Sequence, residues 1–217
     1  MNKRMTRGNR FRLCLLIPTG AWILPRHILI IEAHPDGHDR HLCGALADAY
    51  ATGAANAGFM LRRLDIARLN FPLLRSRDEF ENGVVPEGLA AAAEAIQWAE
   101  HIVIVFPLWL GTMPALLKAF LEQVFRPGVA FQYRNRGVAK RLLVGCSARL
   151  IVTMGMPTPI YRFWFGGHGV SGLRRSILNL AGVRPVKQSL FGMVEQVDEA
   201  ARKRWLTKVE ALGRRGV

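Results

Sequence analysis

The residues of this chain that could do chemistry gather in three loops, each following an apolar run typical of a buried strand. The first loop reads His34-Pro-Asp-Gly-His-Asp-Arg-His-Leu-Cys43 and leads into a segment with helical spacing. The N-terminus of a helix binds phosphate through its free backbone N–H groups, and basic side chains add to that affinity. We therefore expect a phosphate group here, held with the help of His38, Arg40 or His41.

A metal site is the alternative for the same loop, because its histidines stand beside Asp36 and Asp39. However, no Glu-x-x-His or His-x-x-x-His pattern lies on a predicted helix, as the common metal sites would require. The sequence therefore favours a histidine-assisted phosphate loop and predicts no metal.

The second loop, Pro107-Leu-Trp-Leu-Gly-Thr-Met113, is apolar and contains a glycine. It offers backbone N–H and C=O groups beside large flat side chains, which is what the edge and face of an isoalloxazine ring require. The alternative is that Trp109 and Leu110 merely cover the core.

The third loop begins Thr153-Met-Gly-Met-Pro157, and Tyr161 and His168 follow it. Gly155 allows a ligand to approach the backbone closely. Tyr161 and His168 would bring a phenol and an imidazole to the same rim, although either residue alone is more often structural.

Alternating strands and helices must position these loops. The expected strands are His27–Ala33, Phe59–Leu64, Ile102–Phe106, Ala148–Thr153 and Pro185–Met193, and the expected helices are Leu42–Ala57, Leu89–Ala99, Pro114–Phe125, Leu173–Ala181 and Asp198–Leu212. Such alternation is typical of an open, doubly wound parallel sheet with helices on both faces. Ligands bind such sheets beyond the carboxyl ends of the strands, where the loops described above converge. The connection from Asp65 to Pro86 is expected to be a long loop on the same rim.

Composition indicates one compact domain. Half of the 217 residues are apolar, which is enough for a full core over residues 27–217. Residues 1–26 are expected to be a basic, poorly ordered extension. No run of eighteen apolar residues exists, so a membrane-spanning helix is not expected, and the protein should be soluble or peripheral.

The formal net charge of +14 requires that nucleic-acid binding be considered. Much of the excess lies at the two ends of the chain, and no helix-turn-helix, zinc-finger or RNP-like pattern accompanies it, so no nucleic-acid partner is predicted. The three cysteines, Cys14, Cys43 and Cys146, are widely spaced and form no Cys-x-x-Cys pair. They fit a reducing cytoplasm.

Four segments in this order resemble one known family: Ile28–Asp36, Phe106–Phe120, Val152–Pro157 and Gly167–Gly169. The chain resembles the flavodoxin-like NAD(P)H dehydrogenase (quinone) family over roughly residues 27–195. That family includes DT-diaphorase, the modulator-of-drug-activity quinone reductases and the ancillary flavoproteins of glutathione-gated potassium efflux. The resemblance implies a five-stranded parallel sheet with strand order 2-1-3-4-5.

The resemblance also implies an activity. A tightly bound FAD or FMN would take hydride from NAD(P)H at N5 and pass it to a quinone-like acceptor, in a homodimer with the active site at the subunit boundary. One alternative is an ancillary regulatory flavoprotein of a membrane cation system, such as potassium efflux, whose basic ends and aromatic residues near Tyr161 meet a partner or an anionic membrane surface. Another is a flavodoxin-type electron carrier, which would consume no NAD(P)H.

Residue by residue, the flavin-contacting positions of the family match His34, Pro107, Leu108, Trp109, Leu110, Thr153, Met154, Gly155 and Met156. Tyr161 and His168 match the tyrosine and histidine that stabilise charge on the reduced flavin.

The phosphate loop departs from the family pattern. Better-known members have Ser/Thr-Phe-Asn, whereas this chain has the segment from His38 to Cys43, in which Leu42 and Cys43 open the helix. The interval from Tyr161 to His168 is also one residue longer.

Overall fold

The computed structural model describes residues 15–16, 22–23, 26–37, 41–133 and 139–217. Its strands are β1 (Leu15–Leu16), β2 (Trp22–Ile23), β3 (His27–Glu32), β4 (Met60–Asp65), β5 (His101–Pro107), β6 (Phe131–Gln132), β7 (Lys140–Arg141), β8 (Ser147–Thr153) and β9 (Val186–Phe191). Its α-helices are α1 (Leu42–Asn56), α2 (Arg77–Asn82), α3 (Ala90–Trp98), α4 (Ala115–Val124), α5 (His168–Gly172), α6 (Asn179–Ala181) and α7 (Glu199–Arg214). Short 3₁₀ turns η1 (Ile66–Arg68) and η2 (Glu87–Leu89) and π-helical turns η3 (Ile160–Trp164) and η4 (Leu173–Leu178) complete the elements.

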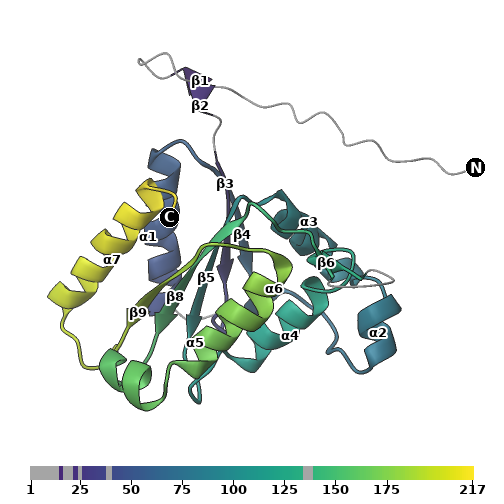
Figure 1. Cartoon of the computed structure of the whole chain (residues 1–217). Helices are drawn as coiled ribbons and strands as arrows, with labels where there is room; N and C mark the ends of the chain where they lie inside the picture. The colour runs from purple at the N-terminus through teal and green to yellow at the C-terminus, as the bar shows by residue number, and fades with distance from the viewer. Residues whose placement is uncertain (1–14, 17–21, 24–25, 38–40, 134–138) are drawn as a thin grey trace, which may run out of the picture.

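Five parallel strands form the central sheet in the order β4-β3-β5-β8-β9. Counted along the chain, these five strands have the order 2-1-3-4-5, which confirms the predicted topology. The order reverses between β3 and β5, so the switch point lies where these two strands end. In Figure 1 the strands run toward the lower end of the view, and their carboxyl ends meet there.

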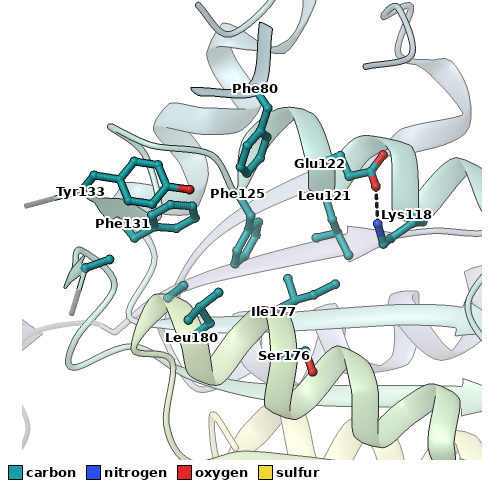
Figure 2. Close-up of a pocket in the computed structure, with 12 residues that line it drawn as sticks. Phe80, Lys118, Leu121, Glu122, Phe125, Phe131, Tyr133, Ser176, Ile177 and Leu180 are labelled. Carbon is teal, nitrogen blue, oxygen red and sulfur yellow. Dashed lines mark hydrogen bonds and ion pairs between the residues drawn. The ribbon is translucent and has the colours of Figure 1, made fainter. Parts of the chain in front are cut away.

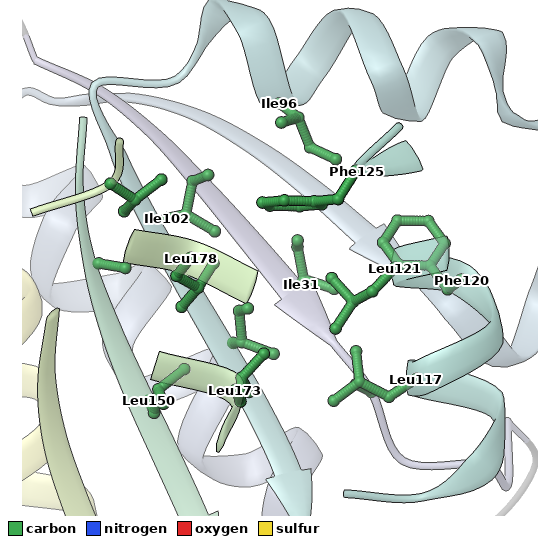
Figure 3. Packing of buried hydrophobic residues seen from close by; sticks show 14 of the residues in the cluster. Ile31, Ile96, Ile102, Leu117, Phe120, Leu121, Phe125, Leu150, Leu173 and Leu178 are labelled. Carbon is green, nitrogen blue, oxygen red and sulfur yellow. The ribbon is translucent and has the colours of Figure 1, made fainter. Parts of the chain in front are cut away.

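Helices cover both faces of the sheet, as predicted (Figure 1). Alternate residues of the buried strands point to opposite faces. Thus Ile28 and Ile30 pack with α1 and α7, whereas Leu29 and Ile31 pack with α3 and α4. Figure 3 shows the second of these cores, where Ile31 meets aliphatic and aromatic side chains from α3, α4 and the α5–α6 segment. The fully apolar strand runs are needed because both faces are buried.

Two predicted segments differ from the structure. The expected loop from Asp65 to Pro86 contains the short helix α2, which Ser76 caps through a bond from Glu79 N–H to its side chain. The expected helix Leu173–Ala181 begins earlier, at His168, and its middle is π-helical. Short apolar periodicity does not distinguish these helix types, because the hydrogen-bond step of a π-helix is only one residue longer than that of an α-helix.

The N-terminal segment 1–26 lies largely outside the described residues, and only the paired strands β1 and β2 and Arg26 are described there. Among the helices that the structure describes, none combines the length and apolar character needed to cross a bilayer.

Candidate functional site

A cavity of about 360 Å³ lies at the carboxyl ends of β3, β5 and β8. The register explains why the loops meet there, since Glu32 pairs with Val105 and Pro107 pairs with Thr153. The predicted site residues that line the cavity are His34, His41, Leu42, Cys43, Pro107, Leu108, Trp109, Thr153, Met154 and Gly155. The structure therefore brings together residues from all three loops singled out in the sequence.

The other predicted residues are not among those that line the cavity. Leu110 and Met156 do not line this cavity, although their neighbours do. His38 and Arg40 lie outside the described residues. Val194 and Glu195 line the cavity but were not predicted. They follow β9, the strand beside β8, so the rule that ligands bind at carboxyl strand ends could have indicated them.

Two stacked histidines form the first wall of the cavity. The rings of His34 and His41 lie 3.8 Å apart between centroids. Burial, followed by the charge of His41, lowers the pKa of His34, which favours a neutral imidazole at neutral pH. Glu32 places a carboxylate oxygen 3.9 Å from His41 Nε2.

His41 is also the N-cap of α1. Its Nδ1 accepts a hydrogen bond from Gly44 N–H at 3.0 Å, and its Nε2 lies 3.1 Å from the Asp36 carbonyl oxygen. These two contacts fix the orientation of the His41 ring at the start of the helix. Leu42 and Cys43 occupy the first turn, where helix geometry leaves backbone N–H groups without intrahelical acceptors. These N–H groups provide a place for an anionic ligand group.

Cys43 forms part of the cavity floor. Its Sγ lies 3.2 Å from Thr153 Oγ1, and burial raises the pKa of the Cys43 thiol to about 12. A thiol with this pKa is neutral and unreactive at physiological pH, so Cys43 contributes packing and not a nucleophile.

The second loop is a tight turn. Trp109 N–H donates to the Thr112 carbonyl at 2.9 Å, and Thr112 N–H donates to the Trp109 carbonyl at 3.0 Å. The two residues between them have positive φ values, 48° at Leu110 and 79° at Gly111. Leucine in this region is strained by roughly 1–2 kcal/mol, and such strain is often found at functional sites. The turn leaves Leu110 fully exposed and holds Trp109 edge-on to His34, with 5.9 Å between ring centroids.

The third loop presents backbone to the cavity. A Cβ atom placed on Gly155 would meet no atom within 4 Å. The backbone N–H groups of Gly155 and Met156 have no acceptor among the residues that the structure describes. The neighbouring Met154 N–H donates to the Phe191 carbonyl at 2.8 Å, which holds the turn in place.

Tyr161 connects the second and third loops. Its side chain is only 1% exposed, and its hydroxyl accepts from Val170 N–H at 3.0 Å and lies 3.4 Å from the Gly111 carbonyl. Burial raises the Tyr161 pKa. His168 is exposed and lies over Gly166, and neither Tyr161 nor His168 lines the cavity. Their predicted role as charge-stabilising donors stays a prediction.

A second cavity, of about 310 Å³, lies between α4, the η4–α6 segment and the loop that carries Phe131. Figure 2 shows its aromatic and aliphatic walls, including Phe80, Phe125 and Leu180, with an ion pair between Lys118 and Glu122 at one side. It shares no lining residue with the first cavity. Among the described residues, no group of three or more histidine, cysteine or acidic side chains is placed to hold a metal ion.

The family model described as the flavodoxin-like fold matches residues 26–212, which is most of the chain. The chain belongs to this family. The family and fold class inferred from the sequence are thereby confirmed.

Two relatives of this flavodoxin-like protein are named as oxidoreductases that use NADH or NAD(P)H. An uncharacterized NAD(P)H oxidoreductase from Haemophilus influenzae is 29% identical over 179 residues, covering 81% of this chain and 88% of the relative. An FMN-dependent NADH:quinone oxidoreductase from Photobacterium profundum is 32% identical over 97 residues, covering 44% of this chain and 48% of the relative. The solved structure of an NAD(P)H:quinone oxidoreductase from Methanothermobacter marburgensis superimposes with a TM-score of 0.71 at 23% identity, covering 88% of this chain and 96% of that one. This last likeness shows the fold.

The cavity of this flavodoxin-like protein fits a flavin. The Gly155 N–H, which has no acceptor among the described residues, would donate to the polar edge of the ring, and the open space over Gly155 leaves room for its face. Trp109 would form a flat apolar wall, and the first turn of α1 would hold a phosphate.

Proposed function

We propose that this protein is a flavin-dependent oxidoreductase that reduces quinones or related acceptors by two electrons at the expense of NAD(P)H. The observation that carries the proposal is the convergence of the three predicted loops on one cavity, where the Gly155 N–H has no acceptor among the described residues. The names of the relatives from Haemophilus influenzae and Photobacterium profundum support it.

FMN is the flavin we propose. The relative from Photobacterium profundum is named as FMN-dependent, and a structural neighbour from Bacillus anthracis was solved with FMN. When bound, the flavin would supply hydride acceptance and delivery at its N5. The chain itself would orient the ring with the loop at Trp109 and hold the phosphate at the first turn of α1.

We assign Tyr161 a positioning role in this function. Its hydroxyl contacts the Gly111 carbonyl, in the loop that carries Trp109, and the Val170 N–H, in α5. Through these contacts it would fix the spacing of the two loops that hold the ring.

The test is to purify the protein, identify any flavin released on denaturation, and follow NAD(P)H oxidation with and without menadione. We expect a yellow protein that releases FMN and whose NAD(P)H oxidation is accelerated by menadione. A colourless protein that binds neither FMN nor FAD would refute the proposal. Release of FAD would correct the cofactor alone.

We also propose that the protein is a cytoplasmic homodimer. The second cavity is apolar and borders the half-exposed Leu180 and Tyr133, a surface that monomers rarely leave uncovered. The free, buried thiols of Cys43 and Cys146 suit a reducing compartment. Leu180→Glu should reduce the mass measured by light scattering to that of a monomer, whereas Val144→Glu, another exposed apolar site, should not.

A further inference from the structure

The turn after β8 exposes an unusual set of aromatic side chains. Phe163 is 86% and Trp164 85% exposed, and Phe165 is about half exposed. All three lie in or directly after η3, which leaves the sheet at the carboxyl end of β8. In Figure 1 this turn lies at the lower end of the molecule, where the strands end.

The aromatic turn adjoins the rim of the candidate site. Tyr161, inside the turn, contacts the Gly111 carbonyl through its hydroxyl at 3.4 Å. Gly169 packs so closely on Gly111 that a Cβ atom there would lie 2.3 Å from the Gly111 carbonyl oxygen. The loop that contains Gly111 also carries the exposed Leu110 and the half-exposed Trp109. Large apolar side chains on two adjoining segments therefore surround the site on one side.

The charge of this part of the chain is of one sign. No aspartate or glutamate occurs between Glu122 and Glu195, whereas Arg162, Arg174 and Arg175 lie in or soon after the aromatic turn. None of these arginines forms an ion pair within the part of the chain that the structure describes. Exposed aromatic rings beside the cationic Arg162 match the interface of an anionic lipid bilayer, where rings insert at headgroup level and cations meet phosphate.

We propose that the turn Ile160–Phe165, which includes Arg162, is a membrane-docking wedge that binds the protein reversibly to anionic lipid surfaces. The wedge would hold the rim of the site against the bilayer, where lipophilic acceptors are dissolved. Docking itself does not depend on the proposed oxidoreductase function and is measurable without turnover.

The experiment is co-sedimentation of the full-length purified protein with vesicles of phosphatidylcholine alone and with added phosphatidylglycerol. We expect binding to the anionic vesicles that weakens at high salt, and little binding to the neutral ones. Phe163→Ser with Trp164→Ser should lower the partition coefficient about tenfold, and Arg162→Gln about fivefold. Val84→Ser, which removes an equally exposed apolar side chain from another loop, should leave it unchanged.

A milder variant protects the test against misfolding. Trp164→Phe keeps an aromatic ring and should still bind, but it should lose much of the fluorescence quenching that lipids with brominated acyl chains cause in the unmodified protein, with Trp109 at the rim contributing the remainder. Equal binding by the double serine variant, or no binding to anionic vesicles, would overturn the proposal. So would a double variant that changes the mass in light scattering while vesicle binding stays constant, since the surface would then join two copies of the chain.

Discussion

The polar groups at the two ends of the sheet differ in their hydrogen bonding. At the amino end, several polar side chains bind one another: Arg26 donates to Ser147, His101 bonds to Ser147 at 2.8 Å, and Arg149 donates to Ser189 at 2.8 Å. The second ring nitrogen of His101, Nε2, is buried without a partner among the described residues. At the carboxyl end, the N–H groups of Gly155 and Met156 have no acceptor among the described residues. Buried polar groups that are satisfied within the fold stabilise it, whereas donors left open are available to a ligand. Substitutions at the carboxyl end should therefore change binding, and those at the amino end stability.

The largest effect is expected at Gly155. Gly155→Val places a branched side chain in the open space over the third loop, so flavin affinity should fall about a hundredfold while the unfolding midpoint changes little. Flavin titration followed by fluorescence quenching measures this. Gly172→Val is the control, because its Cβ position also meets no atom within 4 Å and it does not line the cavity. Equal losses in both variants would mean that Gly155 does not face the ring.

A smaller effect should locate the phosphate. His41→Ser and His41→Asp both keep a side chain that caps α1, so their stabilities should agree. Only aspartate adds a negative charge at the proposed phosphate position, and we expect about tenfold weaker FMN binding with unchanged riboflavin binding. If riboflavin and FMN lose affinity equally, the phosphate does not bind at the N-terminus of α1.

At the amino end, His101 should make stability depend on pH. Burial, reinforced by the nearby cations Arg26, Arg149 and Lys187, lowers the His101 pKa to about 3. The unfolded chain takes up this proton near pH 6.5, whereas the folded protein takes it up only near pH 3. Stability is therefore full above pH 6.5 and falls with decreasing pH, by about 1 kcal/mol between pH 6 and pH 5.

Urea unfolding at several pH values measures this dependence. His101→Gln should lose that part of the slope, whereas His168→Gln, at an exposed position, should keep it. Parallel stability curves for the unmodified protein and His101→Gln would show that His101 is not the group responsible.

The sequence predicted the sheet because its strands are continuous apolar runs, a pattern that requires helices on both faces. It also predicted the three loops, since the ends of buried strands can be found from the same runs. Helix α2 was missed because it has only six residues and no apolar periodicity, since Phe80 is its single apolar side chain.

Side-chain direction in the site could not be predicted in the same way. Tyr161 is expected from the sequence on the rim, but the structure buries it, because the π-helical turn η3 points its ring toward Gly111. The turn type depends on contacts with a loop fifty residues away, as the separation of Tyr161 and Gly111 shows. Local sequence carries no signal for such a contact.

The smallest effect is expected at Leu110. A substitution there tests whether a residue at the carboxyl end of the sheet lowers stability while it contributes to binding. Its φ of 48° favours glycine, and its side chain is fully exposed, so Leu110→Gly removes strain and loses no packing. We expect the free energy of unfolding to rise by about 0.5–1 kcal/mol. Gly111→Ala, at a φ of 79°, should lower the free energy of unfolding by a similar amount.

If the leucine at position 110 contacts an acceptor at the rim, the more stable Leu110→Gly protein should show a higher KM for menadione with an unchanged KM for NAD(P)H. A gain in stability with both KM values unchanged would mean that the strain serves no binding role.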